Sequence, residues 1–171
     1  MFSAMTIHYN ADEVFMMGVD IERNGQEFYH VAAEHTDDQA VAKIFRSLET
    51  AEKKHEKLFE SLRKKLPRDA GGATIFDPYG QSDQYLAALA ETHVFDFQDE
   101  QEIIETIASC DSPRDVLELA LRFEKESMIF FLWMKDHTKP EWGRDRIDQL
   151  IREEQAHVVR IYREMERLER D

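Results

Sequence analysis

The sequence repeats itself with a shift of 102 residues, and this repeat is the feature that most constrains its fold. Residues 20–29 align with residues 122–131, which places Glu22 on Glu124 and one aromatic pair on another. An internal repeat of this kind indicates one supersecondary unit present twice, with the copies packed together. We therefore expect two copies of one helical hairpin.

A second motif obeys the same shift without being used to find it. Glu52-x-x-His55 falls on Glu154-x-x-His157. Counting matches, about one Glu-x-x-His pair is expected by chance in a chain of this composition. Two pairs related by the repeat therefore indicate a shared function.

A third Glu-x-x-His pair, Glu27-x-x-His30, has no counterpart in the repeat. On a helix, Glu27 would lie about 140° around the axis from Glu22. We interpret this pair as the chance match.

Apolar periodicity predicts helices nearly everywhere, and the residues that break it divide the chain. Four long helices are expected, at about residues 11–34, 38–66, 113–137 and 142–171. An irregular connection at 67–82 and weaker helices at 82–92 and 98–109 form a long crossover between them. This order predicts an all-α antiparallel four-helix bundle, two short hairpins joined by one long crossover, in a single domain spanning residues 1–171.

Particular residues mark the expected helix ends. Asn10 or Asp12 can cap the first helix, and Pro67 stops the second. Ser112 followed by Pro113 is typical of a helix start.

Composition excludes several classes of function. A net charge of −14 and a pI near 4.9 argue against nucleic acid as a partner, because phosphate binding needs basic patches. The single cysteine, Cys110, excludes an intrachain disulfide and any Cys-x-x-Cys metal site, and we interpret it as a bystander. The longest apolar run, 128–134, is too short to span a membrane. We expect a cytoplasmic protein with no membrane association.

The paired motifs have the spacing of metal ligands, since residues three apart share one helix face. Four carboxylates and two neutral imidazoles balance two divalent cations, and their mixed oxygen and nitrogen atoms suit iron, manganese or zinc. We expect Glu52 and Glu154 to bridge the cations, with the other four ligands terminal. Burying four carboxylates without a metal would be costly. The predicted ligands are Glu22, Glu52, His55, Glu124, Glu154 and His157.

This pattern of Glu, Glu-x-x-His, Glu and Glu-x-x-His resembles the rubrerythrin branch of the ferritin-like superfamily over essentially the whole chain. The first motif, Glu22-x-x-Gly25-x-x-Phe28-Tyr29, is typical of that branch. The resemblance implies a ferritin-like bundle whose six ligands hold two iron ions, a non-haem di-iron centre that reacts with hydrogen peroxide or dioxygen.

The chain departs from that branch in two ways. Rubrerythrins carry a rubredoxin-like module with two Cys-x-x-Cys motifs, and this chain has one cysteine, so electrons would come from an external donor such as a rubredoxin-like protein. Rubrerythrins also have a further Glu one turn after the position of Glu124, where this chain has Ser127, so the resemblance does not extend to their redox-linked movement of iron. We expect the small pair Gly25 and Ser127 to leave room for an oxidant.

The sequence leaves several alternatives open. The leading interpretation is a di-iron peroxidase; the others are a ferroxidase or iron-handling protein, a non-catalytic metal-binding or partner-binding helical protein, and a structural bundle without metal. The apolar segment 128–134 predicts a homodimer contact, because a bundle alone would cover it only partly. Tyr29 is interpreted chiefly as a packed core residue, and Glu153 receives little weight as a site residue.

Overall fold

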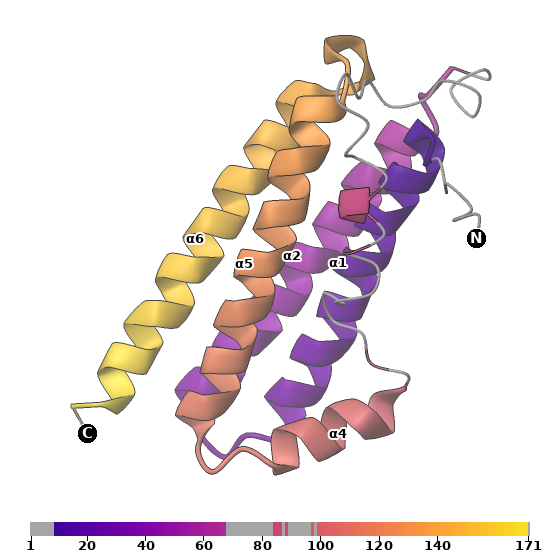
Figure 1. The fold of residues 1–171 in the computed structure, drawn as a ribbon. Helices are drawn as coiled ribbons and strands as arrows, with labels where there is room; N and C mark the ends of the chain where they lie inside the picture. Colours follow the sequence, from indigo (N-terminus) through magenta and orange to yellow (C-terminus); the bar gives the residue numbers. More distant parts are fainter. Residues whose placement is uncertain (1–8, 68–83, 87, 89–96, 98, 171) are drawn as a thin grey trace.

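A computed structural model of the chain describes residues 9–67, 84–86, 88, 97 and 99–170. Four long helices lie side by side, and a short helix, α4, lies across one end of the bundle (Figure 1). The two long helices of each hairpin run antiparallel, whereas α2 and α5, which the crossover joins, run in the same direction. The second hairpin turns through a single 3₁₀ turn, η1. The elements are α1 (Ala11–Glu34), α2 (Gln39–Arg63), α4 (Glu100–Ala108), α5 (Pro113–His137), η1 (Pro140–Trp142) and α6 (Arg144–Leu168).

The first hairpin begins with well-formed caps. Asn10, rather than Asp12, caps α1: its side chain accepts a hydrogen bond from the backbone N–H of Glu13, whose carboxylate accepts from the N–H of Asn10. This reciprocal pair satisfies two backbone donors at the helix start. Helix α2 ends at Arg63, about three residues earlier than predicted, because the chain tightens there into a turn in which Leu66 N–H donates to the Arg63 carbonyl.

The first helix of the second hairpin starts at the predicted residue, but the turn to its second helix is longer than predicted. Ser112 caps α5, which spans the expected residues 113–137. Helix α6 begins at Arg144, about two residues later than predicted, because Gly143 adopts a left-handed conformation with φ of 92° after the 3₁₀ turn. A Cβ atom at Gly143 would also overlap a terminal methyl group of Leu62, so the left-handed backbone and this close approach both favour glycine there.

The described parts of the crossover agree with the predicted helices. Helix α4 corresponds to the predicted helix at 98–109. Of the predicted helix at 82–92, residues 84–86 and 88 are described, and they are helical. The predicted irregular connection lies outside the described residues, apart from Pro67. Among the helices that the structure describes, none combines the length and apolar character needed to cross a membrane.

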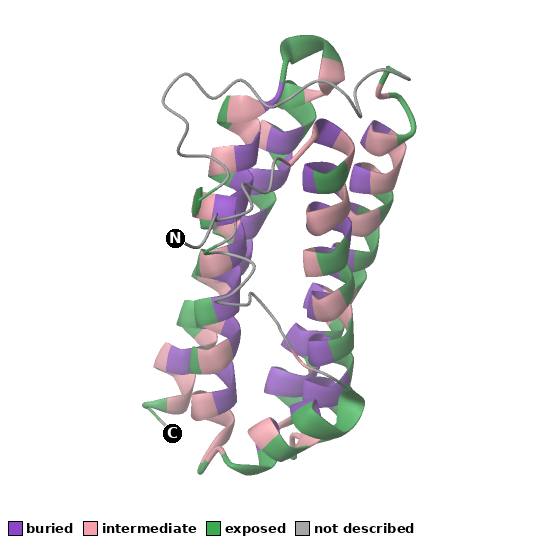
Figure 2. Ribbon diagram, turned by 45° about the vertical axis from the view of Figure 1, so that its right-hand side comes forward, coloured by how far each residue is buried: buried purple, intermediate pink, exposed green. Residues whose placement is uncertain are grey.

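The core consists of two apolar clusters stacked along the bundle, with buried positions facing inward on every long helix (Figure 2). The first cluster, near α4, includes Phe28, Tyr29, Phe45, Leu48, Leu117 and Phe123. The second, near η1, includes Phe15, Phe59, Phe130, Phe131, Met134 and Leu150. On each long helix, one stretch of sequence separates the residues of the two clusters. These four stretches carry the polar residues described below.

The apolar segment 128–134 is only partly covered. Phe130, Phe131 and Met134 face the second cluster and are buried. Ile129 and Leu132 remain 53% and 41% exposed on the outside of α5. The bundle therefore buries one side of this segment, as its period requires.

Candidate metal centre

All six predicted ligands lie in the layer between the two apolar clusters, and each is at most 9% exposed. Every long helix contributes to this layer, because the repeat places a Glu on α1 and α5 and a Glu-x-x-His motif on α2 and α6. The structure thus brings together the whole predicted set, Glu22, Glu52, His55, Glu124, Glu154 and His157.

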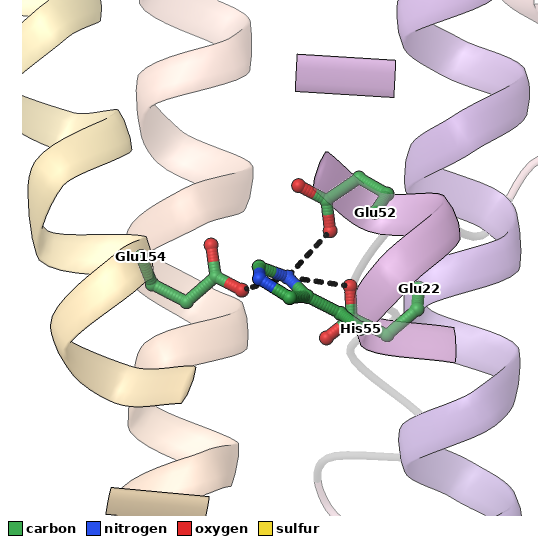
Figure 3. Close-up of side chains that lie close together, drawn as sticks. All are labelled: Glu22, Glu52, His55 and Glu154. Carbon is green, nitrogen blue, oxygen red and sulfur yellow. Dashed lines mark ion pairs between the residues drawn. The ribbon is translucent and has the colours of Figure 1, made fainter. Parts of the chain in front are cut away.

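The first group of donor atoms surrounds His55 (Figure 3). Its Nδ1 lies 2.8 Å from Oε1 of Glu154, 3.6 Å from Oε2 of Glu22 and 3.6 Å from Oε2 of Glu52. Three of these residues come from the first hairpin and one, Glu154, comes from the second. The imidazole therefore points into a space bounded by three carboxylates.

The second group mirrors the first. Nδ1 of His157 lies 2.9 Å from Oε2 of Glu154, 3.5 Å from Oε2 of Glu124 and 3.5 Å from Oε1 of Glu52. Here the second hairpin supplies three residues and the first supplies Glu52. The two imidazole rings are 5.7 Å apart, centroid to centroid.

Glu52 and Glu154 belong to both groups, and each group offers four atoms that lie within 4.8 Å of one another. A carboxylate has two oxygens, so each of these residues can contribute one oxygen to either group. They are the two residues that the sequence analysis predicts as bridging ligands. The arrangement can accommodate two cations, each with one imidazole.

Burial changes the acidity of the four carboxyl groups. It raises the pKa of Glu22, and it raises the pKa of Glu52 well above its usual value, with the nearby charge of Glu22 adding to the effect. Burial and the charge of Glu154 raise the pKa of Glu124 to about 7. Burial acts in the same direction on Glu154, but the hydrogen bond with His157 and the close approach of His55 outweigh it and lower the pKa of that carboxyl.

The pKa values of the two imidazoles are raised, whereas burial alone would lower them. Burial lowers the pKa of His157, but hydrogen bonds with Glu124 and Glu154 reverse the effect and raise this pKa to about 10. The close approach of the carboxylates of Glu154, Glu22 and Glu52 likewise outweighs burial and raises the pKa of His55. In the absence of cations, the layer therefore offsets its negative charge by holding protons.

The donor atoms themselves fit a metal. Oε1 of Glu22, Oε1 of Glu52, Oε1 of Glu154 and Nδ1 of His55 are buried and have no hydrogen-bond partner of suitable geometry among the described residues. Buried acceptors left without a partner are costly, and cations would satisfy them. Two divalent cations would also neutralise four carboxylates when both imidazoles are neutral.

Tyr29 has a role in this layer beyond packing. It is fully buried and stacks on Phe45, as its interpretation as a core residue requires. Its hydroxyl also donates a 2.6 Å hydrogen bond to Oε1 of Glu124. Burial, together with the nearby negative charge of Glu124, raises the pKa of Tyr29 well above its usual value, so the hydroxyl keeps its proton.

Glu153 contacts a predicted ligand, although sequence alone gave it little weight as a site residue. Its Oε2 lies 3.1 Å from Nε2 of His55, on the side of the ring that faces away from the carboxylate layer. One feature of the sequence could have indicated this contact: Glu153 immediately precedes Glu154. Successive residues on a helix are turned by about 100°, which directs Glu153 toward the adjacent helix. By contrast, Glu27 and His30 are both exposed and lie outside the layer, in agreement with the chance interpretation.

Comparison with known proteins supports the architecture. No family model matches the chain, and no curated protein matches it in sequence. Among solved structures, it is similar to a protein from Thermotoga maritima described as a ferritin-like diiron-carboxylate protein. The TM-score is 0.71 at 19% sequence identity, and the match covers 93% of this chain and 96% of the other. The chain has a ferritin-like fold. This agrees with the predicted fold class and with the order of two hairpins and one crossover.

Proposed function

We propose that this protein is a non-haem di-iron oxidoreductase that reduces hydrogen peroxide with electrons from an external donor, and that it belongs to the rubrerythrin-like branch. The observation that carries the proposal is the pair of four-atom groups that share Glu52 and Glu154 in a buried layer. Iron is the proposed metal; manganese and zinc suit the same donor atoms.

Two ferrous ions, when bound, supply the two electrons that convert one hydrogen peroxide and two protons into two water molecules, and the external donor then restores those electrons. The side chains of the chain position this chemistry. Glu22 and His55 would hold one cation, Glu124 and His157 would hold the other, and Glu52 and Glu154 could contribute an oxygen to each. The apolar clusters on either side exclude water from the layer.

Ser127 supports an oxidant-binding role. It is buried one turn after Glu124 on α5, and its hydroxyl has no hydrogen-bond partner among the described residues. A bound oxidant would satisfy this hydroxyl. Two further likenesses support the proposal: the first motif of the chain is typical of rubrerythrins, and the similar protein from Thermotoga maritima is described as a diiron-carboxylate protein.

A second candidate is a ferroxidase that oxidises ferrous iron with dioxygen and passes it on. The net charge of −14 favours it, because a strongly negative surface raises the local concentration of cations. Both candidates use the same six ligands and differ in the oxidant.

One experiment tests both candidates. The metal-free protein is loaded with ferrous iron under anaerobic conditions, its iron content is measured, and it is mixed with hydrogen peroxide or dioxygen in a stopped-flow instrument. We expect two irons per chain and faster oxidation by peroxide. Glu52→Ala should lose both properties, and Glu60→Ala, a partly exposed position on α2 away from the layer, should lose neither. Faster oxidation by dioxygen would favour the ferroxidase, and fewer than two irons per chain would contradict both.

We also propose that the protein is a homodimer that buries Ile129 and Leu132 of α5, since both are large, apolar and exposed. Light scattering after size exclusion should give twice the chain mass of 20.2 kDa for the wild type and the single mass for Ile129→Glu. A wild-type monomer at micromolar concentration would contradict the dimer.

A further inference from the structure

The repeat that builds the metal centre is broken at several positions, and two of these breaks place a polar group against a predicted ligand in one half only. The shift of 102 residues pairs Glu153 with Ala51 and Tyr29 with Phe131. In each pair, one member has a polar group that contacts a predicted ligand, and the other member has none. The six predicted ligands have the same residue types in the two halves, whereas these two contacts are made in one half only.

The first difference lies outside His55. The Nδ1 atom of His55 faces the ligand carboxylates, and its Nε2 atom lies 3.1 Å from Oε2 of Glu153. An imidazole that binds a cation through Nδ1 carries its proton on Nε2, so His55 would donate to Glu153. The amide of Gln149 donates a 3.4 Å hydrogen bond to the other oxygen of Glu153, which helps to hold that carboxylate in place.

A carboxylate that accepts this proton orients the ring and makes the imidazole a stronger electron donor to a metal. Glu153 can serve His55 in this way although its own side chain is 49% exposed, because the contact is made at the rim of the layer. The equivalent residue for His157 is Ala51, whose methyl side chain cannot accept a hydrogen bond. The two imidazoles therefore differ in donor strength.

The second difference acts on the carboxylates. The hydroxyl of Tyr29 donates to Oε1 of Glu124 at 2.6 Å, and this hydrogen bond draws electron density away from that carboxylate. The equivalent residue, Phe131, has no hydroxyl to offer Glu22. Both differences have the same sense: they strengthen the ligands on the Glu22 and His55 side relative to those on the Glu124 and His157 side.

We propose that the two cation positions have unequal affinity, that the position served by Glu22 and His55 fills first, and that Glu153 is the positioning residue responsible. This inference rests on the proposed two-metal centre. It adds an order of filling that the six ligands alone do not specify.

Cobalt(II) is a suitable probe, because it needs no oxidant and its absorbance reports the ligands around it. Metal-free protein is titrated with Co²⁺ under anaerobic conditions, followed by absorbance and calorimetry. We expect two resolved binding steps in the wild type. His55→Ala should abolish the tighter step, and His157→Ala should abolish the weaker step and leave the tighter one.

Glu153→Gln tests the positioning role, because it keeps the size of the side chain and removes its charge. We expect the tighter constant to weaken by roughly 10- to 100-fold, the usual effect of losing such a partner, while the weaker constant stays unchanged. Glu166→Gln, a partly exposed position two turns from the layer on the same helix, is the matched control and should change neither constant. Ala51→Glu should strengthen the weaker constant by supplying the missing acceptor.

The titration distinguishes failure of the order of filling from failure of the proposed two-metal centre. Fewer than two Co²⁺ per chain in the wild type would overturn the two-metal centre and, with it, the order of filling. Two Co²⁺ with equal constants would overturn the order of filling alone. So would a Glu153→Gln variant that binds like the wild type, or one that weakens both steps equally.

Discussion

The hydroxyl of Tyr29 on α1 and the carboxylate of Glu124 on α5 form a buried 2.6 Å hydrogen bond across 95 residues of sequence. The bond joins the two hairpins beside the shared carboxylates. Tyr29 thus belongs both to the first apolar cluster and to the polar layer, and it connects the packing of the core with the geometry of the ligands.

Tyr29→Phe should lower the free energy of unfolding of the metal-free protein by about 1–3 kcal/mol, because it leaves a buried carboxylate oxygen without its donor. Urea denaturation in the presence of a chelator measures this difference. Tyr162→Phe is the control, since Tyr162 is 54% exposed on α6 and its hydroxyl lies outside the core. Equal stability of Tyr29→Phe and the wild type would show that the hydrogen bond contributes nothing.

Ser127→Val should slow the reaction of the iron-loaded protein with peroxide at least about tenfold while leaving two irons bound, because the added methyl groups occupy buried space beside Glu124. Ser127→Ala separates space from hydrogen bonding, since it removes the hydroxyl and adds no bulk. Stopped-flow rates and iron analysis measure the two effects. Unchanged rates in both variants would remove Ser127 from the oxidant site.

Metal removal should weaken the fold without abolishing it, because an apolar cluster packs on each side of the polar layer. We expect the chelated protein to keep its helical circular dichroism and to unfold cooperatively. Metal at one hundred times its dissociation constant should then add about 2.7 kcal/mol of stability for each cation bound. A chelated protein with the spectrum of an unfolded chain would instead identify the centre as a structural clamp.

Asp38, which lies away from the candidate metal centre, makes the stability of the fold depend on pH. Hydrogen bonds from the backbone N–H of Val41 and from Arg167 lower the pKa of Asp38, so the folded protein binds this proton less readily than the unfolded chain. The stabilisation by Asp38 is therefore fully present above its pKa in the unfolded chain, about 3.9. It is lost as the pH falls through its lower pKa in the folded protein.

Asp38→Ala should therefore cost about 1 kcal/mol at pH 7, as expected for a lost N-cap, and the difference from the wild type should shrink below about pH 4. Asp37→Ala, at the exposed neighbouring position, should show neither effect. Denaturation curves at several pH values measure both variants. A cost that is the same at pH 3 and pH 7 would exclude the charged form of Asp38 as its source.

The bundle and the polar layer can be predicted from the sequence because each weak local pattern occurs twice, at positions related by the repeat. A single Glu on α1 says little, but Glu22 and Glu124 support each other across the shift. The late start of α6 could not be predicted in this way. It depends on the left-handed Gly143 and on the side chain of Leu62, which approaches it from the other hairpin.

Glu153 and Tyr29 were underestimated for a related reason. A search based on the repeat finds what the two halves share, and these residues matter because their counterparts, Ala51 and Phe131, differ. Their contacts with His55 and Glu124 become visible only when the helices are packed together. The clustering of the six candidate ligands can thus be predicted from the symmetry of the sequence, whereas the difference between the two halves depends on how the helices pack.

Each group of donor atoms takes three residues from one hairpin and one from the other, with Glu52 and Glu154 crossing between them. A centre that holds the proposed cations would consequently act as a reversible cross-link, because the hairpins could not separate without releasing them. Under the proposed function, resistance to proteases should then follow the supply of metal in the cell. Freshly made chains without metal would open more often and be degraded sooner, so metal availability would influence how much protein persists.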